Sequence, residues 1–153
     1  MQRPGRRALE LVRARAIPVA MLKRALSPFD EVAYAVLRFI AGFMFSFHGV
    51  QKLFGVLTDH ARPPVGSQAW LGGVIELACG VAIALGVWTR AAAFLASGTM
   101  AVAYVQFHWK GAVDSRFLPI VNGGELAVLY CFLYLYVACR GGGRWSVDGR
   151  GRG

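Results

Sequence analysis

Charged side chains are scarce in this chain of 153 residues, and acidic ones are the scarcest, with 8 Asp and Glu against 17 Lys and Arg. More than half of the residues are apolar, and the long apolar segments lack the polar face of a soluble amphipathic helix. A soluble domain needs a charged surface around its core, so this composition excludes an ordinary soluble protein.

Cysteine is also rare, with three residues in the whole chain: Cys79, Cys131 and Cys139. The number is odd and no Cys-x-x-Cys pair is present, which argues against structural disulfides. The three thiols are expected to act as small apolar side chains. A redox role for Cys79 together with Cys131 is the alternative.

Long apolar runs, by contrast, fill the chain. Four blocks have the length of roughly 20 residues that a helix needs to cross a bilayer. They cover about 31–54, 69–88, 90–108 and 118–139. Because these blocks leave no room for a separate soluble domain, the sequence predicts an all-α polytopic membrane protein, an up-down bundle of four transmembrane helices.

The remaining residues lie mostly at the two ends of the chain. Residues 1–27 form a basic leader, 28–140 the four-helix transmembrane domain, and 141–153 a Gly- and Arg-rich tail that is expected to be mobile. The leader does not resemble a signal peptide, because Lys23 interrupts its apolar run. Whether residues 1–20 belong to the native protein stays open, since Met21 could be the true start.

The net charge of +9 follows the expected membrane topology. With four spans, twelve basic residues lie on the side that holds both termini and four on the opposite side. Positive residues favour the cytoplasmic side, so both termini are predicted to be cytoplasmic. Topology explains the charge better than nucleic-acid binding does, and the partner that the composition implies is the lipid bilayer.

Several polar residues nevertheless interrupt the apolar blocks. The candidate site residues are Arg38, His48, Lys52, Glu76, Asn122 and Glu125. A lone charge at the bilayer centre costs about 2.5–3.5 kcal/mol, so these groups are expected to face one another inside the bundle. Arg38 lies within about 11 Å of Glu76 and Glu125 along the axis, and it is expected to pair with one or both of them.

Two interpretations of this buried polar cluster stay open. It is either a structural latch that holds the helices together or a polar pocket for a quinone head group, a proton or a small anion. In the second case Glu76 and Glu125 are candidate proton acceptors. His48 and His108 as axial haem ligands are a further alternative, although His108 and Lys52 also fit the role of snorkelling side chains.

Four segments together carry a resemblance to a known family. Arg38 is followed by "FHGVQKLFG", then "GVIELACGVAIALGVWTRAAAF", then "NGGELAVLY" and a closing "GGGRWSVD". In this order, over about residues 34–148, the sequence resembles the DoxX family. The family's polar motif positions fall on Arg38, His48, Gly49, Lys52, Glu76, Arg90, Asn122 and Glu125.

The resemblance implies a multi-pass protein of the bacterial inner (cell) membrane. Members of the family are linked with quinone-coupled sulfur oxidation and with membrane complexes that handle thiol and oxidative stress. The resemblance therefore implies a subunit that supports an oxidoreductase complex, with quinone as the candidate cofactor and a redox protein or a second copy as candidate partners. A small transporter or a scaffold without a ligand are the alternatives, and whether the chain is itself an enzyme stays open.

Overall fold

The computed structural model describes residue 19 and residues 21–150, and none of these residues lies in a β-strand. The chain divides into two units, Met1–Tyr34 and Ala35–Gly153. The first unit includes the 3-10 turn η1 (Ser27–Phe29) and the start of helix α2 (Asp30–Phe54). The all-α class predicted from the sequence is confirmed for the described residues.

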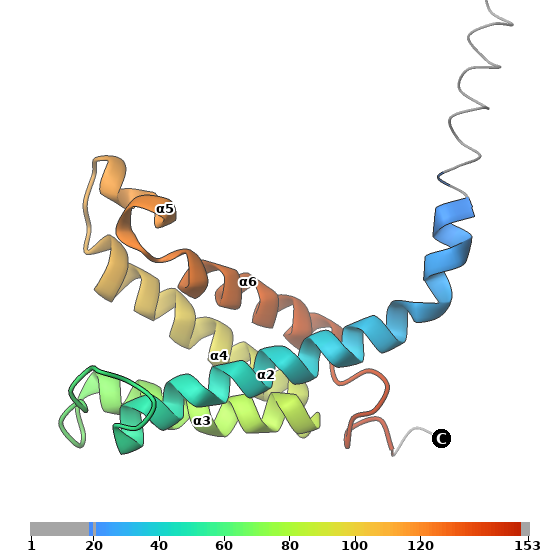
Figure 1. Ribbon diagram of the computed structural model, residues 1–153, viewed down its shortest axis with the longest axis horizontal. Helices are drawn as coiled ribbons and strands as arrows, with labels where there is room; N and C mark the ends of the chain where they lie inside the picture. Colours follow the sequence, from blue (N-terminus) through green and yellow to red (C-terminus); the bar gives the residue numbers. More distant parts are fainter. Residues whose placement is uncertain (1–18, 20, 151–153) are drawn as a thin grey trace, which may run out of the picture. The chain divides into compact units, whose positions relative to one another are not determined.

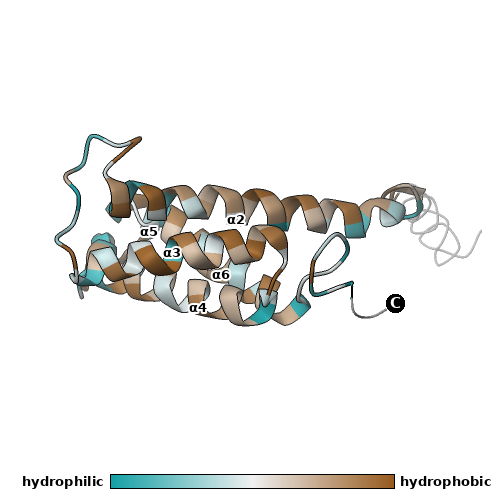
Figure 2. Ribbon diagram, turned by 90° about the horizontal axis from the view of Figure 1, so that it is seen from below, coloured by the Kyte–Doolittle hydropathy of each residue, from teal (hydrophilic) through white to brown (hydrophobic). Residues whose placement is uncertain are grey.

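The second unit contains the rest of α2 and all later elements. These are α3 (Gln68–Leu85), α4 (Thr89–Ala103), the π-helix η2 (Tyr104–Trp109), the 3-10 turn η3 (Ser115–Phe117), α5 (Pro119–Asn122) and α6 (Glu125–Arg140). The long helices lie side by side and alternate in direction (Figure 1). Figure 2 shows that apolar residues predominate along all four of them.

Helices α2 and α3 approach each other through glycines. A Cβ atom added to Gly42 would lie 2.5 Å from the backbone nitrogen of Ala84, and one added to Gly49 would lie 2.5 Å from that of Leu77. Small residues allow such close backbone contact, which contributes more in lipid than the meeting of apolar side chains does. The two contacts also show that α2 and α3 are antiparallel.

Helix α6 packs against both α2 and α4. The Tyr134 hydroxyl donates a hydrogen bond of 2.9 Å to the Ala41 carbonyl of α2, and the Ser97 hydroxyl of α4 donates one of 2.8 Å to the Cys131 carbonyl. The ring of Phe45 lies 4.9 Å from that of Tyr134, and both side chains are fully buried. Ile83 of α3 is also fully buried, so the core lies between α2, α3, α4 and α6.

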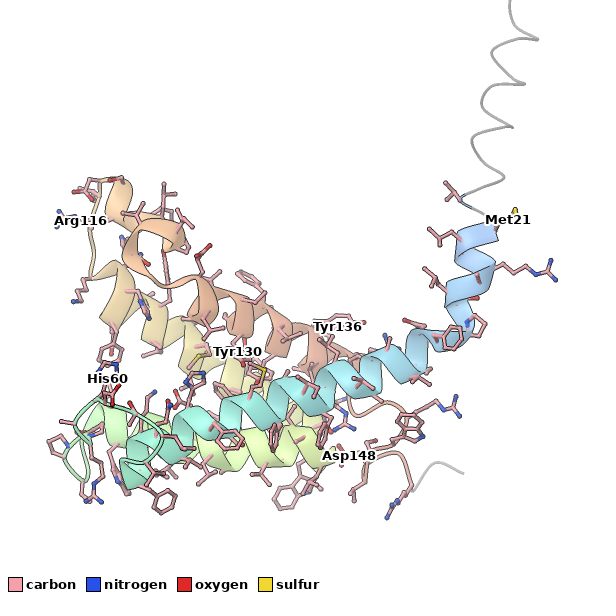
Figure 3. All side chains as sticks on the ribbon, in the orientation of Figure 1. Met21, His60, Arg116, Tyr130, Tyr136 and Asp148 are labelled. Atoms are coloured by element: carbon pink, nitrogen blue, oxygen red, sulfur yellow. The ribbon has the colours of Figure 1, made fainter. Side chains whose placement is uncertain are left out.

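The C-terminal segment closes one end of the bundle. The carboxylate of Asp148 accepts hydrogen bonds from the backbone nitrogens of Trp88 and Thr89, at 2.9 and 2.8 Å. The Asp148 backbone nitrogen in turn donates to the Gly86 carbonyl at 2.9 Å. Figure 3 shows Asp148 at this end and Arg116 at the other. The expectation of a mobile tail is wrong around Asp148, and residues 151–153 lie outside the described part of the chain.

Two helical stretches, Met21–Phe54 and Gln68–Leu85, are long and apolar enough to cross a membrane. Helix α4 has 15 residues and continues directly into the six residues of η2, and α6 has 16 residues. A span takes roughly 20 residues in a helix. Four transmembrane helices therefore stay a prediction, while two membrane-length helices are observed.

The fourth apolar block, 118–139, is interrupted near its start. Helix α5 ends at Asn122, and Gly123 follows with a φ of +72°, a left-handed conformation that favours glycine. Helix α6 starts two residues later, at Glu125. The break moves Glu125 from the interior of a predicted span to the first turn of a helix.

Candidate functional site

Arg38 does not pair with Glu76 or Glu125. Its guanidinium donates hydrogen bonds to the carbonyls of Ile83 and Ala84 in the last turn of α3, the second at 2.8 Å, and to the Trp145 carbonyl at 3.0 Å. The side chain is 1% exposed. The expected pairing of Arg38 with the two glutamates is therefore wrong, although the expectation that Arg38 faces inward agrees with its burial.

The position of Arg38 along α2 explains this difference. Because α2 and α3 are antiparallel, Arg38 lies beside the C-terminal end of α3, where the final carbonyls lack partners within the helix. That end of a helix carries partial negative charge and attracts a cation. Arg90 likewise binds the C-terminal end of α6, where it donates to the carbonyls of Ala138 and Cys139 at 2.9 and 2.5 Å.

Glu76 instead forms an ion pair with Lys52. The Lys52 Nζ lies 2.5 Å from Glu76 Oε1, and the two side chains are 37% and 2% exposed. Gly73 allows this contact, because a Cβ at Gly73 would lie 2.8 Å from the Lys52 Cβ. The missing side chain lets Lys52 pass over α3 and reach the carboxylate one turn further along.

The second carboxylate oxygen, Glu76 Oε2, is buried and has no hydrogen-bond partner among the described residues. An ionised carboxylate has two oxygens and about four acceptor positions. A buried acceptor without a partner costs about 1–3 kcal/mol, and more when it is charged. Such an atom needs an explanation, and a ligand donor is one.

Glu76 and Lys52 line a groove between α3 and α4, with a volume of about 630 Å³. Gln68 donates a hydrogen bond to Gln106 across one end of it, where His108 also contributes to the lining. The groove walls are largely apolar and include Leu71, Ile75, Phe94, Leu95, Val102 and Phe107. Pockets of this kind, apolar with a few polar groups, are typical binding sites for small molecules.

The other four predicted site residues lie outside this groove: Arg38, His48, Asn122 and Glu125. The His48 ring packs edge-on against Tyr130 of α6, with ring centres 6.3 Å apart. Asn122 stabilises the break before α6, because its side-chain oxygen accepts from the Gly124 nitrogen at 2.8 Å. Glu125 is exposed on the first turn of α6. The predicted cluster is thus divided, and of its six residues Lys52 and Glu76 line the groove.

The haem alternative requires His48 and His108 to face a common space, but they contact different residues. His48 meets Tyr130, whereas His108 Nδ1 lies 3.3 Å from the Asn122 carbonyl. Within residues 21–150 no group of three His, Cys, Asp or Glu side chains is placed to hold a metal ion. The three cysteines are free thiols.

Sequence reasoning missed two features of the site. It did not identify the groove, which depends on how α3 and α4 are spaced, nor the glycines Gly72 and Gly98 that line it. It also missed Asp148 as the cap of α4. The Ser-x-Asp order before the end of the chain gave no sign that Asp148 would reach back to Thr89.

Comparison with known proteins identifies the family of this chain. The family model described as DoxX matches residues 33–109. An uncharacterised protein of Haemophilus influenzae is 40% identical over 119 residues, which cover 76% of this chain and 88% of that protein. No solved structure matches the chain. The region matched by the family model contains most of α2, all of α3 and α4 and the groove between the last two, and the chain belongs to the DoxX family of membrane proteins.

Proposed function

We propose that this protein is a membrane subunit that binds a quinone in the α3–α4 groove and thereby supports a quinone-linked or thiol and oxidative-stress oxidoreductase complex. The observation that carries the proposal is the buried Glu76 Oε2, which lacks a hydrogen-bond partner among the residues that the structure describes and lies in the wall of an apolar groove of about 630 Å³. The family resemblance, with its link to quinone-coupled oxidation, adds to this observation.

The chemistry of the groove favours a neutral, amphipathic ligand. Lys52 and Glu76 neutralise each other, so the pair attracts neither a net anion nor a net cation. The Lys52 ammonium can donate to a ring carbonyl and Glu76 Oε2 can accept from a ring hydroxyl. These are the two polar groups of a quinone and its reduced form. The apolar walls suit the isoprenoid tail.

Access from the lipid phase also fits this class of ligand. Leu71, Leu95 and Phe94 all line the groove and are exposed on the helix surface, Phe94 with 69% of its area. In a bilayer these side chains would meet acyl chains. A lipid-soluble molecule could therefore enter sideways, without first crossing into water.

The electron donor is proposed to be a separate redox protein.

We propose that the protein lies in the bacterial inner membrane, as a multi-pass protein with both termini in the cytoplasm. The alternating directions of α2, α3, α4 and α6 support this, because four crossings return the chain to the side where it started. The basic residues at both ends of the chain favour the cytoplasmic side.

A permeation pathway is less well supported by the interior of the bundle. Such a pathway needs polar groups or space along the helix axis. Between the levels of Arg38 and Glu76 lie Phe45, Ile83 and Tyr134, which are all fully buried. A close-packed apolar layer between the two charged groups is a poor route for a proton or a small anion.

The proposal is tested by quinone binding to the purified full-length protein in detergent. We expect a short-tailed benzoquinone to raise the unfolding temperature of the wild type. Glu76→Gln should weaken binding roughly 10- to 100-fold, because the ligand loses its charged acceptor. Glu125→Gln makes the same chemical change outside the groove and should bind like the wild type. Binding that is unaffected by Glu76→Gln, or is absent from the wild type, would refute the proposal.

A variant that keeps the charges balanced distinguishes a loss of quinone binding from a loss of folding. Glu76→Gln leaves the Lys52 ammonium without its partner, which itself destabilises a buried site. The double variant Lys52→Met with Glu76→Leu removes both charges together. It should fold at least as well as Glu76→Gln and should still fail to bind the quinone.

A further inference from the structure

Five of the six glycines in α2, α3 and α4 fall into two groups according to what a side chain would meet, and the sixth, Gly73, faces the side chain of Lys52. A Cβ at Gly42, Gly49 or Gly80 would come within 2.6 Å of a backbone atom of the neighbouring helix, so these residues are explained by helix packing. A Cβ at Gly72 or Gly98 would meet nothing within 4 Å. Packing therefore does not explain Gly72 and Gly98.

Both of these glycines line the α3–α4 groove. Their position relative to Glu76 follows from the register of the two antiparallel helices. A three-residue turn joins Leu85 to Thr89, and Gln68 bonds to Gln106 at the far end. Equal numbers of residues along the two antiparallel helices, counted from either of these points, bring Gly98 to the level of Glu76. Gly72 lies one helical turn from Glu76 on the same face of α3.

Glycine in the interior of a helix is unfavourable relative to alanine, because it loses more conformational freedom on folding. Two such residues in one groove, in positions where larger side chains would fit, leave a flat open surface on each wall. This open surface lies next to Glu76 Oε2, the one buried carboxylate oxygen that lacks a hydrogen-bond partner in the described part of the chain. The two helix-interior glycines and the unpaired carboxylate oxygen are each unfavourable for the stability of the protein alone. Their occurrence side by side indicates a space that a ligand fills.

We infer that Gly72 and Gly98 form a slot that admits the planar ring of the ligand edge-on to Glu76, and that the two glycines set the size of ring that the groove accepts. The inference rests on the proposed function and deepens it. Phe94 and Phe107 also line the groove and supply aromatic surface for the same ring. The ring polar atoms then reach Glu76 and Lys52, while the tail extends along the apolar wall.

The slot predicts a specific effect of ring size. Gly98→Ala adds one methyl group to the wall beside Glu76, and a change of this size in a binding pocket alters affinity about tenfold or more. We expect Gly98→Ala to weaken a naphthoquinone, which has two fused rings, about tenfold more than a benzoquinone with the same tail. Gly98→Leu should abolish binding of both.

Ala91→Leu is the matched control, because Ala91 is an exposed residue of α4 outside the groove. It should fold and bind both quinones like the wild type. The unfolding temperature of Gly98→Ala without ligand should equal or exceed that of the wild type, since alanine favours the helix. A lower unfolding temperature would show that Gly98 serves packing, and this would overturn the inference.

The outcomes separate the slot from the proposed function. If the wild type binds neither quinone, the proposed function and the slot fail together. If the wild type binds and Glu76→Gln does not, but Gly98→Leu binds both rings as tightly as Ala91→Leu does, the quinone site stands and the slot is wrong. If Gly98→Leu does not fold, the affinities of Gly98→Ala and Gly72→Ala for the naphthoquinone and the benzoquinone decide the question. A substitution that weakens the binding of both quinones equally would overturn the slot.

Discussion

Asp148 accepts two hydrogen bonds from Thr89, one from the backbone nitrogen at 2.8 Å and one from the hydroxyl at 2.7 Å. A residue near the end of the chain therefore provides the N-terminal cap of α4. The Trp88 nitrogen adds a third bond at 2.9 Å. Because α4 forms one wall of the groove, the C-terminal segment stabilises the site from a distance.

Removal of this cap should destabilise the protein. Asp148→Ala leaves the first backbone nitrogens of α4 without an acceptor, and loss of such a cap costs about 1 kcal/mol. Thermal unfolding in detergent measures the change. Asp59→Ala is the control, since Asp59 is exposed in the loop between α2 and α3, and surface substitutions of this kind change stability little. An equal effect of both variants would contradict the capping role.

The same cap predicts a dependence of stability on pH. Burial opposes ionisation of Asp148, but the hydrogen bonds from Thr89 and Trp88 outweigh it and hold the pKa of the carboxyl below its ordinary value of 3.8. The contribution of Asp148 to stability is thus fully present above pH 3.8 and is lost as the pH falls below it, through the lowered pKa of the folded state. Asp148→Asn should remove this part of the acid dependence, and unfolding measured along a pH series would reveal it.

Arg38 should be a strong determinant of folding and not of ligand binding. Arg38→Ala removes the donor to three carbonyls, those of Ile83, Ala84 and Trp145. The Ile83 carbonyl keeps its bond from the Gly86 nitrogen at 3.1 Å, but the Ala84 carbonyl loses its donor from Arg38. An unpaired buried carbonyl costs about 1–3 kcal/mol, so the unfolding temperature and the yield should fall. Arg116→Ala, on an exposed turn, should change little. The protein that does fold should keep its quinone affinity, because Arg38 lies outside the groove. Loss of binding at unchanged stability would contradict this assignment.

Glycines at the α2–α3 contact should behave in the opposite way to Gly98. A Cβ at Gly49 would lie 2.5 Å from the Leu77 nitrogen, so Gly49→Ala forces α2 and α3 apart. Such overpacking costs about 1–3 kcal/mol. It should also loosen the contact between Lys52 and Glu76, three residues further along α2. Gly98→Ala makes the same change where space is free, and comparison of the two unfolding temperatures tests the difference.

The sequence was sufficient to predict the helices and the inward position of Arg38 and Glu76. Their depth in the apolar blocks, and the cost of placing a charge in lipid, indicated that both are buried. It was insufficient to predict their partners, because depth along an axis does not show which way a long side chain extends. Arg38 extends toward the free carbonyls at the end of α3, and Glu76 toward the nearer cation, Lys52.

Glu125 shows how a small change in a helix boundary alters a predicted site. The apolar block at 118–139 indicated a continuous helix with Glu125 inside it. The left-handed Gly123 ends α5, and α6 starts at Glu125, which leaves this carboxylate exposed. The groove was also beyond prediction, since it arises from the spacing between α3 and α4 and not from any local pattern.

The most direct test of the central claim is the quinone content of the protein purified from its membrane, measured by solvent extraction and expressed per chain. The wild type and Glu125→Gln should retain bound quinone, and Glu76→Gln should lose most of it, because within residues 21–150 Glu76 Oε2 is the one buried side-chain acceptor without a protein partner. Quinone that is retained equally by all three proteins, or is missing from the wild type, would contradict the account.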